Sequence, residues 1–298
     1  MKLGEASGQQ TESPKLTLHG FLQTLHSTIV PRTYLEIGVF RGESLRLALC
    51  PAVGIDPAPV IESRLRASTF VVEATGDDFF ARPRPLDPYY QHDGVRWQSL
   101  LRRPRLIKRW LKGAPRRSDG ECFAELALID GMHHAEFALR DFMNVERNSA
   151  PWSVIIFDDM LPQNQTQALR TRATGDWTGD VFRLHKVLNT YRPDLVTVLV
   201  DTDPTGVLVV FAPNHLDERL RTSYDQIVAE NVQEDPQVVP DDVLQRSGAL
   251  SAELFFSIGL FDVIRTARER RESSVWVARE VRAALARSGL TPSSALAK

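Results

Sequence analysis

The sequence predicts an α/β fold: a doubly wound, mostly parallel sheet of seven strands with an antiparallel last strand. Five apolar runs alternate with helical patterns between residues 33 and 191, as in parallel strands joined by crossover helices. Several of these runs are apolar at every position, as expected for strands covered on both faces. The last two runs are joined by a tight turn at 203–206, too short for a crossover helix, so we expect an antiparallel hairpin there.

The opening strand is expected at residues 33–37, and two glycines behind it, Gly38 and Gly42, define a turn. Glycine lets the backbone turn sharply and approach a ligand without an intervening Cβ. A short helix is expected after the turn, with its N-terminal N–H groups pointing back toward it. The second strand ends in Asp56, whose carboxylate can accept hydrogen bonds from the hydroxyls of a ribose. Together these features predict a nucleoside pocket.

The remaining elements continue the alternation. Strands are expected at 52–55, 68–74, 123–129, 154–157, 195–200 and 207–211, and helices at 16–29, 44–49, 134–147 and 180–191. Beyond residue 213 the pattern changes to charged helical segments at 216–231, 251–271 and 274–288. We therefore expect a main domain over 15–213 and a helical C-terminal extension over 214–298, through which a homodimer could form. The polar residues 1–14 are expected to be disordered.

Residues 82–117 interrupt this pattern with eleven Lys or Arg against two acids. We interpret the segment as a solvated basic insertion with a cationic face. The alternatives are a lid over an anionic substrate and an arm that contacts RNA.

Composition excludes several classes of protein. A net charge of −2 argues against a dedicated nucleic-acid or membrane-surface protein, and no apolar run reaches the length of a membrane span. The N-terminus lacks the apolar core of a signal peptide. The two cysteines, Cys50 and Cys122, have neither metal-site nor disulfide spacing, which favours free thiols in a reducing compartment. The sequence thus predicts a cytoplasmic protein.

Acidic residues follow the expected strands, at the edge where open α/β sheets bind their ligands. They are Asp56, Asp77, Asp130, Asp158 and Asp159. Asp130, Asp158 and Asp159 follow adjacent strands, within reach of one hard cation, and oxygen ligands favour Mg²⁺, Ca²⁺ or Mn²⁺ over zinc. His133, just behind Asp130, is a candidate general base or metal ligand.

The pattern Glu36-x-Gly38-x-x-x-Gly42-x-Ser44, followed by Asp56, resembles the first two motifs of class I S-adenosylmethionine-dependent methyltransferases. Residues 129–133 and 157–159 are similar to a narrower group, the small-molecule O-methyltransferases of the macrocin and catechol type. The resemblance covers about residues 30–212 and implies the Rossmann-like sheet of that family.

The resemblance also implies roles for single residues. The cofactor S-adenosyl-L-methionine would be bound by Glu36, Gly38, Gly42 and Ser44 at its methionine part, by Asp56 at the ribose and by Asp77 near the adenine. In the metal-dependent members, Asp130, Asp158 and Asp159 would hold a divalent ion such as Mg²⁺. His133 would be the base, with Asp130 beside it in the catalytic group. The expected reaction methylates a hydroxyl of a small-molecule acceptor, such as a sugar or natural-product intermediate.

Three alternatives remain open from the residues. An NAD-dependent oxidoreductase also uses a glycine turn and an acid after the second strand, but here the turn reads E-x-G-x-x-x-G rather than G-x-G-x-x-G. A methyltransferase-like binding module would have no need for the row of strand-end acids. RNA methylation is supported only by the basic insertion, and no N/D-P-P-Y/F sequence follows the fourth strand.

Overall fold

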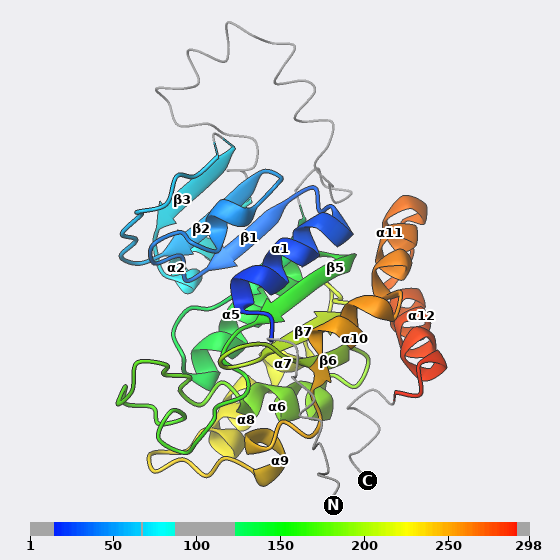
Figure 1. Cartoon of the computed structure of the whole chain (residues 1–298). Coiled ribbons are helices and arrows are strands. Elements are labelled where there is room, and N and C mark those ends of the chain that lie inside the picture. The colour runs from blue at the N-terminus through cyan, green and yellow to red at the C-terminus, as the bar shows by residue number, and fades with distance from the viewer. Residues whose placement is uncertain (1–14, 67, 87–122, 291–298) are drawn as a thin grey trace, which may run out of the picture.

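A computed structural model describes residues 15–66, 68–86 and 123–290 of the chain (Figure 1). The expectations for residues 1–14 and for nearly all of the basic insertion therefore lie outside the described residues. Among the helices that are described, none combines the length and the apolar character needed to cross a membrane.

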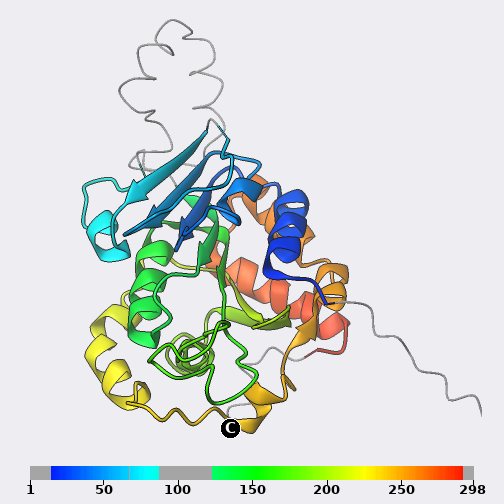
Figure 2. The same cartoon turned by 60° about the vertical axis from the view of Figure 1, so that its left-hand side comes forward.

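The centre of the molecule is an eight-stranded sheet with the strand order β3-β2-β1-β4-β5-β7-β6-β8. The strands are β1 (Tyr34–Ile37), β2 (Ala52–Asp56), β3 (Thr69–Glu73), β4 (Ala124–Ile129), β5 (Ser149–Phe157), β6 (Val196–Asp201), β7 (Val207–Phe211) and β8 (Leu250–Ser251). All neighbours pair in parallel except β7, which runs antiparallel to both β5 and β6. Figure 2 shows the arrows of β1, β2 and β3 pointing to the same side.

The predicted fold class and terminal hairpin are confirmed. The sheet has one strand more than predicted, because β8 adds two residues in parallel to β6. A two-residue strand is too short to show any periodicity in the sequence.

The helices mostly follow the predicted pattern. They are α1 (Leu18–Ile29), α2 (Gly76–Phe80), α5 (Ala135–Arg147), α6 (Arg183–Tyr191), α7 (Arg219–Thr222), α8 (Tyr224–Asn231), α9 (Asp241–Leu244), α10 (Ala252–Ser257), α11 (Leu260–Arg270) and α12 (Ser274–Arg287). The helix expected at 44–49 is only one 3₁₀ turn, η1 (Leu45–Leu47). The glycine turn and the next strand are separated by only a few residues. So short a segment forms too few hydrogen bonds to offset the unfavourable free energy of helix nucleation. The segment expected as one helix at 251–271 is split at Gly259, where φ is +79°.

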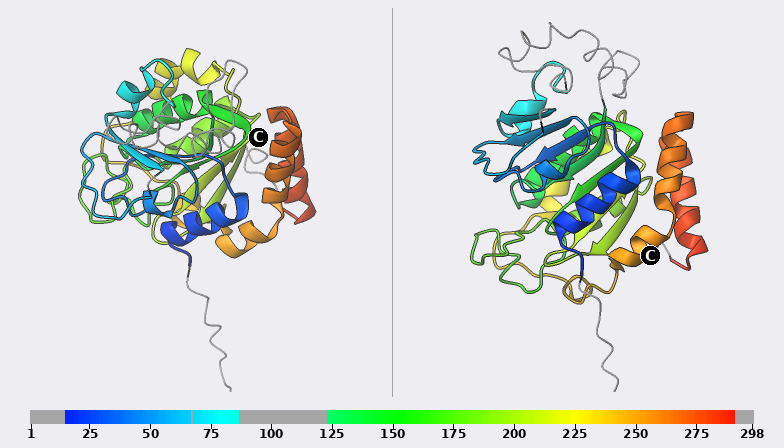
Figure 3. Two further views of the ribbon diagram at one scale, coloured as in Figure 1. Left: turned by 90° about the horizontal axis from the view of Figure 1, so that it is seen from above. Right: turned by 45° about the horizontal axis from the view of Figure 1, so that its top comes forward.

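Each face of the sheet carries its own apolar core. The core on one face combines residues of α1, α10, α11 and α12 with Tyr34 of β1, and the core on the other combines residues of α2, α5, α6 and α8 with Leu35 and Ile37 of the same strand. The alternation along β1 thus sends successive side chains into different cores. Figure 3 shows α11 and α12 side by side along one edge of the molecule, and both contact β5. The last helices are therefore part of the covering of the sheet.

His26 of α1 is a buried titratable group in the first of these cores. Its side chain is 1% exposed, and its ring meets the ring of Tyr34 edge-on at 4.7 Å. In the described part of the chain neither ring nitrogen has a hydrogen-bond partner. Burial, helped by the positive charge of Arg66, lowers the pKa of His26 to about 4.

We expect His26 to make the fold sensitive to acid. The unfolded chain binds a proton at this position below a pKa of about 6.5, whereas the folded chain does so only near 4, so stability falls as pH drops through this window. Between pH 7 and pH 5 this loss amounts to about 2 kcal/mol. Urea unfolding at both pH values should show that His26→Leu loses less stability than the wild type over the same interval. An equal loss in both proteins would contradict the assignment.

Candidate functional site

A cavity of about 830 Å³ opens at the carboxyl ends of the parallel strands. Its wall takes residues from the loops that follow β1, β2, β3, β4 and β5, because parallel strands bring these loops to one edge of the sheet. Of the predicted site residues, those lining it are Gly38, Ser44, Asp56, Asp77, Asp130, His133, Asp158 and Asp159, whereas Glu36 and Gly42 are not in its wall. The volume suits a ligand of nucleoside size.

The glycine turn packs directly on the end of β4. Gly38 has φ +87°, and a Cβ at this position would lie 1.8 Å from the carbonyl oxygen of Asp130. The Gly38 N–H donates to the carbonyl of Ile55 at 2.9 Å, which ties the turn to β2 as well. Only glycine combines this conformation with so close an approach.

Replacing Gly38 with alanine is expected to destabilise the protein more than the same change at Gly42. Both residues have positive φ, but a Cβ at Gly42 would have nothing nearer than the side chains of Ile61 and Leu65, at 3.4 Å. Gly42→Ala should therefore cost only the backbone strain, about 1 kcal/mol, and Gly38→Ala should cost several times as much because the turn must also move. Chemical denaturation of the two variants measures the difference, and equal losses would contradict this packing.

Glu36 lies beneath the turn, in the protein interior. Its side chain is fully buried, and its two carboxyl oxygens each lie 2.6 Å from a hydroxyl oxygen, those of Tyr34 and Ser44. Burial raises the pKa of Glu36 to about 8, against the opposing effect of these two hydrogen bonds. Glu36 therefore fixes the orientation of Ser44, and it is Ser44 that faces the cavity.

Asp56, at the end of β2, shapes the glycine turn. One carboxylate oxygen accepts the N–H groups of Val39 and Phe40 at 2.9 and 2.8 Å, and the other accepts that of Ala58 at 2.7 Å. A carboxylate has about four acceptor positions, and the described residues fill three of them, so the fourth can accept a ligand hydroxyl in the cavity that Asp56 lines.

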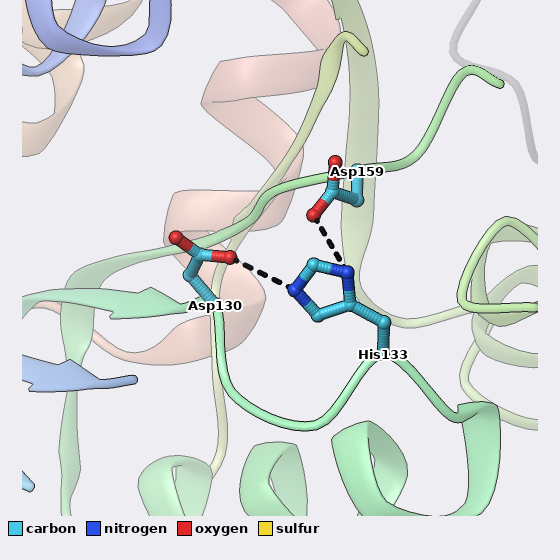
Figure 4. A group of neighbouring side chains, drawn as sticks. All are labelled: Asp130, His133 and Asp159. Carbon is cyan, nitrogen blue, oxygen red and sulfur yellow. Dashed lines mark ion pairs between the residues drawn. The ribbon is translucent and has the colours of Figure 1, made fainter. Parts of the chain in front are cut away.

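The imidazole of His133, which also lines the cavity, lies between the carboxylates of Asp130 and Asp159 (Figure 4). Its Nε2 is 3.5 Å from Oδ1 of Asp130, and its Nδ1 is 3.2 Å from Oδ2 of Asp159. Nδ1 also lies 2.7 Å from the carbonyl oxygen of Trp177, which can only accept. The proton of the neutral ring therefore sits on Nδ1, and Nε2 is the basic atom, facing Asp130.

Burial and the charges of neighbouring side chains set the pKa values in this group. Burial lowers the pKa of His133, but the hydrogen bond with Asp130 and the charges of Asp159 and Asp130 outweigh it and raise the pKa to about 9. Burial and the neighbouring acids raise the pKa of Asp159 to about 7, although the charge of His133 opposes this. The pKa of Asp158 is raised well above its usual value by burial and by Asp159 and Asp130. The site therefore favours a positive charge at its centre.

The same group has the donor set of a metal site. Two carboxylate oxygens and one imidazole nitrogen converge here, all within 4.8 Å of one another. They come from Asp130, Asp159 and His133. Two of the three expected metal ligands, Asp130 and Asp159, are in this group. Asp158 lines the cavity but is not a member of the group, and His133 takes the third place.

Trp177 is a site residue that the sequence reading missed. Its ring stacks on the imidazole of His133 at 4.9 Å with an angle of 15°, and its indole N–H donates to the carbonyl of Leu169 at 2.5 Å. The loop that carries it is fastened to the start of α5 by Asp180, which accepts the N–H of Ala135 at 2.7 Å. A tryptophan in an otherwise polar loop was the available signal, but its partner lies 44 positions away along the chain.

Asp77, expected near the adenine, follows β3 and also lines the cavity. Its carboxylate is half exposed and forms an ion pair with Nε of Arg140 at 3.0 Å. Asp77 therefore already has a charged partner.

Solved structures similar to this chain include several methyltransferases. Cofactor-bound Rv0187 from MTB shares 16% identity over 65% of this chain and 78% of its own, with a TM-score of 0.42. The O-methyltransferase TomG from Streptomyces achromogenes, in complex with SAM, shares 16% over the same proportions, with a TM-score of 0.39. MycE from the mycinamycin biosynthetic pathway, in complex with Mg, SAH and mycinamycin VI, shares 15% over 67% of this chain and 51% of its own, with a TM-score of 0.38.

No protein-family model matches the sequence, and no similar curated protein was found. Identities and TM-scores as low as those of the similar structures carry no conclusion about what this chain binds or catalyses.

Proposed function

We propose that the protein is an S-adenosyl-L-methionine-dependent methyltransferase acting on a hydroxyl of a small molecule. The observation that carries this proposal is the shared cavity: the glycine turn and Asp56 open into the same space as the group of Asp130, His133 and Asp159. The residues suited to a nucleoside and the acid–base group thus share one cavity, as a transfer reaction between a nucleoside cofactor and a second molecule requires.

The cofactor would lie along the ends of β1, β2 and β3. Ser44 and the turn at Gly38 would contact its methionine part, and the free acceptor position of Asp56 would take a ribose hydroxyl. The acceptor would then lie beside His133. With a pKa of about 9, His133 is mostly protonated at neutral pH, so the base would be its minor neutral form. In that form, with its Nδ1–H held by the Trp177 carbonyl, it would take the hydroxyl proton at Nε2 while the methyl group passes in line from sulfur to oxygen.

The residues present also fit a divalent metal ion. Asp130 and Asp159 would supply oxygen ligands and His133 a nitrogen, a donor set that suits Mn²⁺ and, through its carboxylates, Mg²⁺. When bound, such an ion would lower the pKa of the acceptor hydroxyl. His133 can act as base or as ligand, and the predicted ligand Asp158 lies at the same wall of the cavity.

The strongest rival is an NAD-dependent oxidoreductase, and the charge of the cavity disfavours it. A dinucleotide would place a pyrophosphate with two negative charges near the turn, beside Asp56 and within the field of Asp130. The sulfonium of S-adenosylmethionine is positive and would be attracted by the same carboxylates. A binding module without catalysis has no use for a histidine held between two carboxylates.

Calorimetric titration with S-adenosylhomocysteine, and separately with NAD, tests the proposal. We expect S-adenosylhomocysteine to bind with a micromolar dissociation constant and NAD to give no heat of binding. Binding of NAD alone would overturn the proposal.

The cytoplasmic location and a homodimer through the C-terminal helices stay predictions. The apolar sides of α11 and α12 face the sheet, so such a dimer would have to use their outer, charged sides.

A further inference from the structure

Asp141 is a buried carboxyl that none of the roles above uses. It lies in the second turn of α5, lines the cavity and is only 8% exposed. Across the described residues no hydrogen bond reaches its side chain. Burial, with a further contribution from the charge of Asp77, raises its pKa to about 7, although Arg140 acts in the opposite direction. A carboxyl in the wall of a cavity, with little exposure and no partner among the described side chains, is suited to accept a hydrogen bond from a bound ligand.

The position of Asp141 is defined by two glycines. A Cβ at Gly76, which follows β3, would lie 2.1 Å from its Oδ1, and a Cβ at Gly131, which follows β4, would lie 3.6 Å from its Oδ2. The carboxyl therefore fills space that a side chain at position 76 would occupy, and it reaches the cavity between the loops that follow β3 and β4. Asp141 lines the same cavity as His133 but is not a member of the group of Asp130, His133 and Asp159.

The strand order indicates which part of a nucleoside cofactor would meet this carboxyl. The methionine part is assigned to the turn after β1 and the ribose to Asp56 after β2, so the base extends from there toward β3, the next strand in the sheet. Two acids line the cavity near the start of α2, Asp77 and Asp141. Asp77 is half exposed and already paired with Arg140. Asp141 is buried, and its carboxyl oxygens can accept a hydrogen bond.

We propose that Asp141 accepts a hydrogen bond from the exocyclic amino group of the cofactor's adenine and thereby selects a 6-aminopurine. This inference rests on the proposed function. A base lacking the amino group would shield Asp141 from water and leave it without a donor. Sites built in this way discriminate against a ligand that lacks the donor, and a single hydrogen bond to a carboxyl corresponds to about 10- to 100-fold in affinity.

The test compares three homocysteine thioethers by calorimetric titration: S-adenosylhomocysteine, its analogue with hydrogen in place of the 6-amino group, and its inosine analogue with a 6-oxo group. We expect the wild type to bind S-adenosylhomocysteine about 10- to 100-fold more tightly than the analogue without the amino group. Asp141→Leu, which removes the acceptor, should bind these two ligands within about threefold of each other. Asp141→Asn should gain affinity for the inosine analogue, because an amide N–H can donate to the 6-oxo group.

The control is Asp78→Asn, an exposed carboxyl of α2 outside the cavity wall, which should keep the wild-type preference. Unchanged discrimination in Asp141→Leu would overturn the inference while leaving the proposed function intact. If the leucine variant does not fold, an asparagine variant with the wild-type order of affinities for all three ligands would overturn it equally. A wild-type protein that binds none of the three would overturn both proposals.

Discussion

A chain that ends after Pro213 is expected not to fold. The helices α11 and α12 bury Phe261, Ile264, Val277 and Leu285 against one face of the sheet, each with 2% exposure or less, and α10 adds Phe255. A fully buried side chain of this size contributes about 1.5–3 kcal/mol, so these five together contribute on the order of 10 kcal/mol. That is comparable to the whole free energy of unfolding of a typical protein, about 5–15 kcal/mol.

Polar contacts anchor the same helices to the segments that precede β1 and β6. The guanidinium of Arg282 donates to three consecutive carbonyls before β6, those of Pro193, Asp194 and Leu195, at 2.8 to 3.1 Å. Arg268 of α11 donates to the carbonyl of Val30 at 2.8 Å. Truncation would therefore remove these bonds and also expose the apolar face of the sheet.

The truncation is measured by thermal unfolding followed by circular dichroism and by the yield of soluble protein. A chain ending after Leu290, which keeps all described helices, is the matched control and should unfold at the wild-type temperature. A soluble 1–213 fragment with a cooperative transition would show instead that residues 214–298 are dispensable for the core.

Removing the carboxylate of Asp159 is expected to abolish divalent-metal binding without changing cofactor binding. Asp159 supplies one of the three converging ligand atoms, and its loss leaves only Asp130 and His133. Two ligands bind a hard cation far more weakly than three, so Asp159→Ala should lower the affinity for Mn²⁺ by at least about 100-fold. The cofactor contacts assigned to Ser44 and Asp56 come from other loops and should persist.

Electron paramagnetic resonance of Mn²⁺ reports metal binding directly, and calorimetry with S-adenosylhomocysteine reports the cofactor site in the same variant. Asp225→Ala, an exposed carboxyl on α8, is the control and should leave both unchanged. Asp158→Ala distinguishes the ligand set predicted from sequence from the one that the geometry favours. A large loss of affinity for Mn²⁺ in this variant would show that Asp158 is a ligand. A wild-type protein that takes up no Mn²⁺ at millimolar concentration would overturn the metal proposal and leave His133 as the acid–base group alone.

The sequence by itself determined the layout of the cavity. Fully apolar runs alternating with amphipathic segments predict parallel strands, and parallel strands bring Gly38, Asp56, Asp130 and Asp159 to one edge whatever the details of packing. The hairpin of β6 and β7 also follows from local information, because its connection is too short for a crossover.

Only the tertiary structure decided which face each side chain takes and what lies opposite it. Glu36, expected at the cofactor, points into the core because it lies on the same side of β1 as Tyr34. Which core each side of β1 faces depends on the helices that cover the sheet. His133 gains its fixed tautomer from Trp177, and Asp141 its position from the loops after β3 and β4. Contacts between residues distant in the chain depend on how the elements pack, and a sequence pattern records only the elements themselves.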